Sequence, residues 1–131
     1  MNARLCLVTT LLIVAAIPIW YGIWELWSWL VLDWHYRQWV EALDPTRLLL
    51  WALHLVVCIG LGLFAVVVGQ PKRPLVFGAV VGIVFELIQT FGTRDFVAPD
   101  FRYGLYVVAP LGSFLGAGIA LRFIPRNDNA I

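Results

Sequence analysis

The stretch Leu75-Val-Phe-Gly-Ala-Val-Val-Gly-Ile-Val-Phe-Glu-Leu-Ile-Gln89 decides the fold of this chain, because it is apolar throughout except for two residues near its end. A carboxylate near the middle of a bilayer costs roughly 2.5 to 3.5 kcal/mol on insertion scales, so Glu86 is a candidate functional residue. Two glycines and both polar residues share one helical face: Gly78, Gly82, Glu86 and Gln89. At about 100° per residue they lie within about 80° of one another, and small residues at this spacing let a second helix approach closely. We therefore expect Glu86 to point into a helix-packed interior and not at lipid.

The composition of the chain is that of an integral membrane protein. Of its 131 residues, 62% are hydrophobic and 13% are charged, whereas a soluble domain contains about 25% charged residues. The net charge of +1 gives no indication of nucleic-acid binding. The length suits one compact bundle without a separate soluble domain, so we predict a single transmembrane domain over residues 1–131.

Four apolar segments are long enough, or nearly so, to cross a hydrocarbon core of about 30 Å at about 1.5 Å per residue. They comprise, approximately, residues 5–24, 48–69, 75–91 and 105–123. Pro18 is expected to kink the first segment, and Pro110 lies near the start of the fourth. The sequence therefore predicts an all-α fold, an integral membrane four-helix bundle.

The connection between the first two segments, residues 25–44, is rich in tryptophan. Within it, Asp33, Arg37 and Glu41 follow one another at i, i+4 spacing, and alternating charges at this spacing support a helical turn. The pattern suits a helix that lies in the membrane interface or extends past it. The bundle is therefore predicted to include an interfacial Trp-rich helical segment.

The distribution of Lys and Arg predicts the orientation of the bundle, because cytoplasmic loops are enriched in these residues. One side of a four-span map has five of them and the other has four: Arg4, Lys72, Arg73, Arg122 and Arg126 against Arg37, Arg47, Arg94 and Arg102. The short basic turn from Gln70 to Pro74 fits the same direction, so we predict that both termini are cytoplasmic. Six tryptophans then gather at the outer interface: Trp20, Trp24, Trp27, Trp29, Trp34 and Trp39.

The fourth segment repeats the small-residue spacing in Gly112-Ser-Phe-Leu-Gly116. Because small residues four apart allow close contact between helices, we expect Gly112 and Gly116 to pack against the third segment. Gly78 and Gly82 of the third segment would then form the other half of that contact.

His54 lies about two turns into the second segment, close to Trp51. An intramembrane histidine can ligate haem iron or chlorophyll magnesium, or it can form a hydrogen bond to a neighbouring helix. The hydrogen bond is favoured, because the only other histidine, His35, falls in the Trp-rich connection. The chain has no Cys-x-x-Cys-His motif, nucleophile elbow or phosphate loop. We predict no cofactor and no metal site, and catalysis has little support in the sequence.

Several features follow one another over roughly residues 75 to 120: Glu86-Leu-Ile-Gln89, Arg94-Asp95-Phe96, Asp100 and Gly112-Ser-Phe-Leu-Gly116. Together they resemble the VanZ-like family of small bacterial membrane proteins. That family shows a Glu-x-x-Gln pair near the end of one span, an Arg soon after it, acidic residues in the loop, then an Asn and a Gly-rich final helix. This chain departs from the pattern in its longer loop and in Ala109, which stands where the family has Asn.

The resemblance implies a multi-pass protein of the bacterial inner membrane and an association with resistance to lipoglycopeptide antibiotics such as teicoplanin. We therefore expect an envelope protein whose outward-facing polar site binds a lipid headgroup or a cell-wall precursor, with membrane lipids as partners. The candidate ligand-binding residues are Glu86, Gln89, Arg94, Asp95 and Asp100. A second hypothesis is a non-catalytic accessory subunit of a larger photosynthetic or respiratory membrane complex, in which His54 contacts a pigment or haem.

Overall fold

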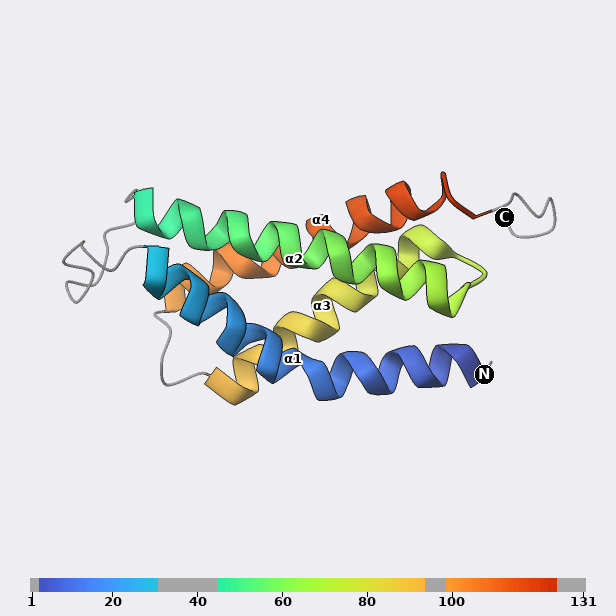
Figure 1. The fold of residues 1–131 in the computed structure, drawn as a ribbon, viewed down its shortest axis with the longest axis horizontal. Helices are drawn as coiled ribbons and strands as arrows, with labels where there is room; N and C mark the ends of the chain where they lie inside the picture. The colour runs from blue at the N-terminus through green and yellow to red at the C-terminus, as the bar shows by residue number, and fades with distance from the viewer. Residues whose placement is uncertain (1–2, 31–44, 94–98, 125–131) are drawn as a thin grey trace.

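The computed structural model describes residues 3–30, 45–93 and 99–124, and within them it contains four helices and no strand (Figure 1). The helices are α1 (Ala3–Leu30), α2 (Pro45–Gly69), α3 (Pro74–Thr93) and α4 (Pro99–Ala120). Successive helices run in opposite directions, so the start of α1 and the end of α4 lie at the same end of the molecule (Figure 1). The prediction of an all-α four-helix bundle is confirmed.

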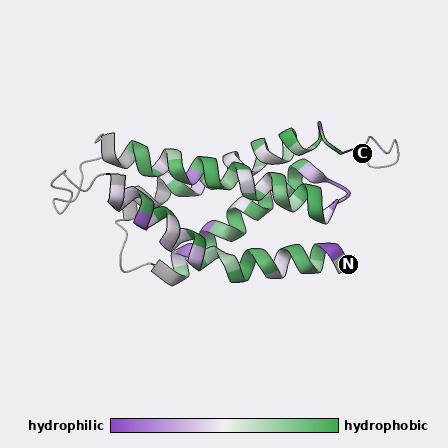
Figure 2. Ribbon diagram, in the orientation of Figure 1, coloured by the Kyte–Doolittle hydropathy of each residue, from purple (hydrophilic) through white to green (hydrophobic). Residues whose placement is uncertain are grey.

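Three helices are long and apolar enough to cross a membrane: Ala3–Trp27, Leu48–Gly69 and Pro74–Phe91. The apolar part of α4, Gly104–Ala120, is shorter. Figure 2 shows that apolar residues cover most of the helical surface, while hydrophilic residues gather at the start of α1 and at the turn between α2 and α3. The described part of the chain therefore has the composition and helix lengths of an integral membrane protein.

The helix ends differ from the expected spans in two places. Helix α1 continues beyond residue 24 to Leu30, so the first six residues of the predicted interfacial segment extend this helix. Residues 31–44 of that segment lie outside the described residues. Helix α4 begins at Pro99 and ends at Ala120, and residues 121–123 form a turn, so the fourth helix begins six residues earlier and ends three residues earlier than the predicted span of 105–123.

Helix α1 packs against both α2 and α3, and it bends near its middle, where Pro18 lies (Figure 1). Proline interrupts the backbone hydrogen bonds of a helix, and such a kink redirects the axis. In the first half, Val8 packs in a cluster with Ala65 of α2 and Val81 of α3. In the second half, Ile23 packs in a cluster with Leu50 of α2. The predicted kink lies between these two contact regions of α1.

The tryptophans of α1 divide between the interior and the surface. Trp20 and Trp27 are buried, and Trp24 lies between them with ring centroids 5.6 Å from Trp20 and 5.1 Å from Trp27. Trp29, in contrast, is 68% exposed. This corrects the expectation that all of these rings serve the membrane interface. Positions 20, 23 and 27 share one helical face, so two of the rings pack into the bundle.

Close contact of α3 with α4 depends on the glycines of α3. A Cβ atom at Gly78 would lie 2.5 Å from the Ala117 Cβ, and one at Gly82 would lie 2.6 Å from the backbone carbonyl carbon of Ala109. Real Cβ contacts of this length essentially never occur, so larger residues at Gly78 and Gly82 would push the two backbones apart. The predicted role of these two glycines in packing against the fourth segment agrees with their positions.

The glycines of α4 face a different helix from the one expected. A Cβ atom at Gly112 would lie 2.8 Å from the Cys58 Cβ, and one at Gly116 would lie 2.8 Å from the backbone carbonyl carbon of Ile59, both on α2. The expectation that Gly112 and Gly116 pack against the third segment is therefore wrong. A second row of small residues on α4 contacts α3 instead: Ala109, Ser113 and Ala117.

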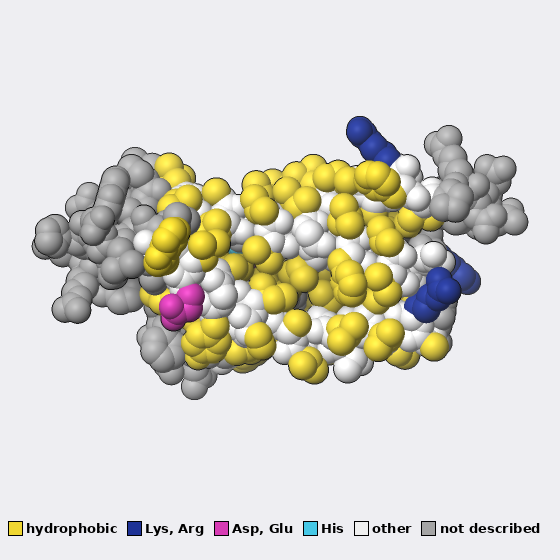
Figure 3. Space-filling view, viewed as in Figure 1, with side chains coloured by type: hydrophobic (Ala, Val, Ile, Leu, Met, Phe, Trp, Pro, Cys, Tyr) yellow, Lys and Arg dark blue, Asp and Glu magenta, His cyan; other side chains and the backbone are white. Residues whose placement is uncertain are grey.

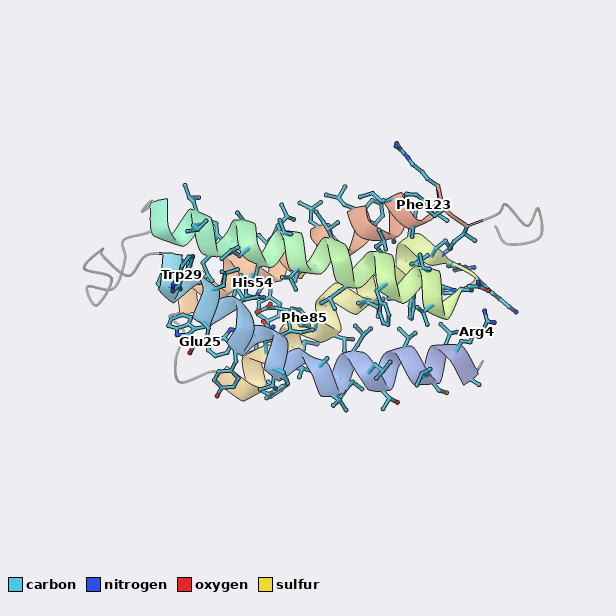
Figure 4. All side chains as sticks on the ribbon, in the orientation of Figure 1. Arg4, Glu25, Trp29, His54, Phe85 and Phe123 are labelled. Atoms are coloured by element: carbon cyan, nitrogen blue, oxygen red, sulfur yellow. The ribbon has the colours of Figure 1, made fainter. Side chains whose placement is uncertain are left out.

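Apart from Glu86, the charged residues whose side chains the structure describes lie near the ends of the helices. Figure 3 shows Lys and Arg at the end that holds the start of α1, and an acidic side chain at the opposite end. The cations at the first end include Arg4, labelled in Figure 4, and the pair Lys72 and Arg73 in the turn between α2 and α3. Glu25 lies at the other end (Figure 4).

Candidate functional site

The candidate site is a buried polar cluster, formed by His54 of α2 and by Glu86 and Gln89 of α3. Their side chains are 1%, 2% and 1% exposed, respectively, in surroundings that are otherwise apolar. Figure 4 shows His54 beside Phe85 in the interior of the bundle, and the two ring centroids are 6.5 Å apart. The buried polar cluster therefore lies between helices and not on the lipid-facing surface.

Gln89 joins three helices through its side-chain amide. The Nε2 atom of His54 on α2 donates to the Gln89 oxygen at 3.0 Å, and the Gln89 nitrogen donates to the backbone carbonyl of Ala16 on α1 at 3.4 Å. Ala16 is fully buried and packs with Phe85 of α3. Its small side chain allows α1 to approach α3 at this level. Gln89 thus holds the imidazole and the bent helix α1 in fixed positions beside the Glu86 carboxyl group.

Glu86 lies one turn before Gln89 on the same inner face of α3. Because Gly82 brings the backbone of α4 against α3 one turn earlier, Glu86 points into a closely packed region. The buried Cys58 of α2, one turn after His54, packs in the same apolar cluster as Phe85, the residue before Glu86. The structure thus places Glu86 in the helix-packed interior, as the spacing from Gly78 to Gln89 predicted. Among the described residues, no group of His, Cys, Asp and Glu is placed to hold a metal ion.

The pairing of His54 with Gln89 was not predicted, although the sequence contains a signal for it. Lys72 is the middle residue of the turn from Gln70 to Pro74, and it lies 18 residues after His54 (72 − 54) and 17 residues before Gln89 (89 − 72). In two antiparallel helices joined by a short turn, residues equally far from the turn lie at the same depth. The near-equality of 18 and 17 residues therefore indicates that the two polar side chains lie at about the same depth.

A pair of hydroxyl groups lies between the buried polar cluster and the end of α3. The Thr90 Oγ1 and the Tyr106 hydroxyl of α4 are 2.7 Å apart, and the pair is partly buried. Thr90 directly follows Gln89, so polar groups continue from the cluster towards the end of the bundle at which Glu25 lies. Polar side chains therefore extend from Gln89 to the Thr90 and Tyr106 hydroxyl pair near the end of α3.

The structure describes the other candidate ligand-binding residues only in part. Arg94 and Asp95 lie outside the described residues, directly after α3. Asp100 is the second residue of α4, and its side chain lies outside the described part of the chain. The structure therefore brings Glu86 and Gln89 together with His54, and the roles of Arg94, Asp95 and Asp100 stay predictions from sequence.

The position of His54 bears on the alternative hypothesis of a pigment or haem ligand. Its Nε2 atom, one of the two nitrogens that can bind a metal, forms the hydrogen bond to Gln89. The imidazole is buried between helices and contacts a neighbouring helix by this bond. Of the two roles expected for His54, the hydrogen bond between helices is the one observed.

No protein family, curated protein or solved structure matches this chain. The resemblance to the VanZ-like family therefore depends on the residues that suggested it, chiefly Glu86, Gln89 and Arg94. Of these three residues, the structure describes Glu86 and Gln89, which lie on one face of α3.

Proposed function

We propose that this chain is a VanZ-like protein of the bacterial inner membrane whose polar site binds a lipid headgroup or a cell-wall precursor. The observation that supports this proposal is the complete burial of Glu86 beside Gln89 and His54. Gln89 already joins three helices through uncharged groups, and such bonds are sufficient to hold membrane helices together. Burying a carboxylate in the membrane costs free energy, and an uncharged link between helices avoids this cost. We therefore assign Glu86 to ligand binding.

The orientation follows from the charges at the two ends of the bundle. We place the end with Arg4, Lys72 and Arg73 in the cytoplasm, because short cytoplasmic loops are enriched in Lys and Arg. Glu86 then lies in the outer half of the membrane. It is 12 residues from the start of α3 and 7 residues from its end, or about 18 Å and about 10 Å along the helix axis.

In this orientation the ligand reaches the buried polar cluster from the outer face, along the side where Thr90 and Tyr106 lie. Glu86 accepts hydrogen bonds from an amine or hydroxyl group of the ligand. Gln89, held by His54 and by the Ala16 carbonyl, orients the site. Arg94, five residues after Gln89, supplies positive charge for a phosphate or carboxylate, and Asp95 and Asp100 are further candidates for polar contacts.

The orientation is tested by cysteine-accessibility labelling in intact cells. A cysteine in place of Lys72 should react only from the cytoplasmic side, and a cysteine in place of Asp100 should react with an impermeant reagent from outside. Cys6 and Cys58 are replaced by Ser and Ala in all variants, so that the introduced thiol is the only one present. The reverse labelling pattern would overturn the orientation.

The binding function is tested by mass spectrometry of lipids that stay with the protein during gentle purification. Glu86→Gln keeps the shape of the side chain and removes its charge, so the variant should fold and lose the headgroup class that the wild type retains. Glu25→Gln is the matched control, because it makes the same chemical change at an exposed position of α1. If Glu86→Gln retains the same lipids as the wild type, the binding proposal is wrong.

An accessory subunit of a larger membrane complex is the second candidate function. It is favoured by the aromatic residues exposed on the second half of α1, Tyr21 and Trp29, on either side of Glu25. The same gentle purification tests it, because an accessory subunit would come with a stoichiometric protein partner, and a photosynthetic or respiratory complex would show visible absorption bands. A preparation that contains the chain and lipid alone would contradict this second candidate.

A further inference from the structure

Four exposed cations lie at the end of the bundle that holds the start of α1 (Figure 3). One is in the first turn of α1, two are in the turn between α2 and α3, and one follows the end of α4. They are the only Lys and Arg residues whose side chains the structure describes: Arg4, Lys72, Arg73 and Arg122. We refer to these four residues as the basic end.

The start of α1 is held against the turn between α2 and α3 by apolar packing beneath the cations. A Cβ atom at Gly69, the last residue of α2, would lie 3.2 Å from Leu5 Cδ2 and 3.8 Å from the ring of Phe77 on α3. Arg4 directly precedes Leu5, and Lys72 lies three residues after Gly69 (72 − 69). Cations that are far apart in the sequence therefore lie on one surface, and Figure 4 shows Arg4 beside the turn.

The charge of the basic end is not balanced by the carboxylates that the structure describes. These carboxylates are Glu25, which lies at the opposite end, and Glu86, which is buried between helices (Figure 4). Within the described part of the chain, no acidic side chain lies at the basic end. The surface is therefore electrostatically complementary to an anionic partner.

Apolar side chains beside the cations place the basic end at the membrane surface. Phe123, next to Arg122, is 73% exposed, and Leu7, three residues after Arg4, is 55% exposed. At the end of a membrane-spanning helix such apolar side chains contact acyl chains, while the long side chains of Arg and Lys extend to the interface. The four cations therefore face the phosphate layer of the membrane.

We infer that the basic end binds the phosphate groups of anionic phospholipids, of which phosphatidylglycerol is the simplest. Arg and Lys form charge-assisted hydrogen bonds with phosphate oxygens. A cation close to an anionic membrane surface strengthens binding by about fivefold. A zwitterionic headgroup contains the same phosphate with an ammonium that offsets its charge, so it should bind less tightly. This second lipid site lies at the opposite half of α3 from Glu86, and it does not depend on the proposed function.

The test is a lipid titration of the full chain in a neutral detergent, in which native mass spectrometry counts the bound lipids. Phosphatidylglycerol should bind more tightly than phosphatidylcholine with the same acyl chains. In the double variant Lys72→Gln and Arg73→Gln, the affinity for phosphatidylglycerol should fall about 25-fold, because two cations are removed. Equal affinity of the wild type for the two lipids, or an unchanged affinity in the double variant, would overturn the inference.

Matched variants show whether position or charge alone decides the binding. Arg47→Gln removes a cation at the opposite end of α2 and should leave the affinity unchanged. The double variant Lys72→Arg and Arg73→Lys keeps both charges and should bind as the wild type does. Arg4→Gln should lower the affinity about fivefold, and it covers the case in which the first double variant fails to fold. If Arg47→Gln weakens binding as much as Arg4→Gln, the inference is wrong.

Inorganic phosphate distinguishes a lipid site from a site for free phosphate. An excess of inorganic phosphate should displace no more phosphatidylglycerol than sodium chloride of the same ionic strength, because the acyl chains also contact the apolar residues beside the cations. Greater displacement by phosphate would show that the basic end binds the free ion, and the assignment to lipid would fail.

Salt separates the basic end from the proposed headgroup site at Glu86. Exposed charges are screened by salt, whereas buried groups are screened much less. Lipid retention and thermal unfolding of Glu86→Gln are therefore measured in high salt, where the basic end should release its lipid. Loss of the proposed site at Glu86 then appears in high salt, and loss of the basic end appears only in low salt, so the failure of one is distinguishable from the failure of the other.

Discussion

Helix α4 contacts its neighbours largely through backbone and small side chains, whereas α1 contacts them through tryptophan rings as well as through the small Ala16. On the α4 side, Gly82 and Gly116 bring helices so close that a Cβ atom would collide with backbone. On the α1 side, Trp20 and Trp27 fill the contact, and a groove remains beside α3. One side of this bundle is therefore closely packed, whereas the other leaves an apolar groove, lined by Thr9, Leu12 and Ile13 of α1 and by α3 side chains between Phe77 and Ile88.

The buried polar cluster lies where these two regions meet. Glu86 and Gln89 follow Gly82 on the face of α3, and Gln89 reaches across to α1. The α4 side therefore fixes the position of the carboxyl group by close backbone contact, and Gln89 attaches the α1 side to the same cluster. This division of roles predicts that mutations on the two sides have effects of different size and kind.

The largest expected effect is that of Gly82→Leu on the α4 side. The new side chain would collide with the backbone of Ala109 and Pro110, which cannot move aside as a flexible side chain can. We expect a loss of roughly 3 kcal/mol in the free energy of unfolding, at the upper end of the range for overpacked cores, and a smaller loss for Gly82→Ala. Unfolding in detergent with increasing denaturant measures both.

Gly60→Leu is the matched control for this prediction. A Cβ atom at Gly60 on α2 would meet no heavy atom of the described residues within 4 Å, so the same substitution should change stability little. Equal stability of Gly82→Leu and the wild type would show that backbone contact does not define the α4 side.

An intermediate effect is expected for the hydrogen bonds that attach α1. Gln89→Leu removes the bonds to His54 and to the Ala16 carbonyl, and bonds of this kind between membrane helices contribute about 0.6 to 2 kcal/mol. A double-mutant cycle with His54→Leu should show a coupling free energy of about 1 kcal/mol. Additive losses would mean that the two side chains do not stabilise the bundle together.

The smallest effect on stability is expected for Val80→Trp in the groove. Because Val80 lies on the rim of an open groove, the change in the free energy of unfolding should stay within about 0.5 kcal/mol. A loss as large as that of Gly82→Leu would indicate that the α1 side is as closely packed as the α4 side, which would remove the contrast between them.

The sequence predicts the elements of this fold well, because their signals are local. Apolar length defines the helices, and the repeat of Gly78 and Gly82 indicates an inner face that also includes Glu86. The bend of α1 follows from Pro18 alone. These features depend on spacing within one helix, so a single sequence is sufficient to find them.

The partners of each face are harder to predict, because they depend on which helices are neighbours. Gly112 and Gly116 indicate a close contact but do not name the helix, and they pack on α2 and not on α3. The burial of Trp20 and Trp27 was not predicted, because tryptophan is common both at the membrane–water interface and in helix-packed cores. Pairing His54 with Gln89 required the depth of both residues relative to the turn between α2 and α3.

The most direct test of the central claim, that Glu86 binds lipid and does not merely hold the bundle together, is thermal unfolding with and without added phosphatidylglycerol. A ligand that binds only the folded state raises the unfolding temperature. We predict that Glu86→Gln unfolds at the wild-type temperature in detergent alone and loses the increase that the lipid gives the wild type. If Glu86→Gln shows the same lipid-induced increase as the wild type, or unfolds earlier without lipid, the claim is contradicted.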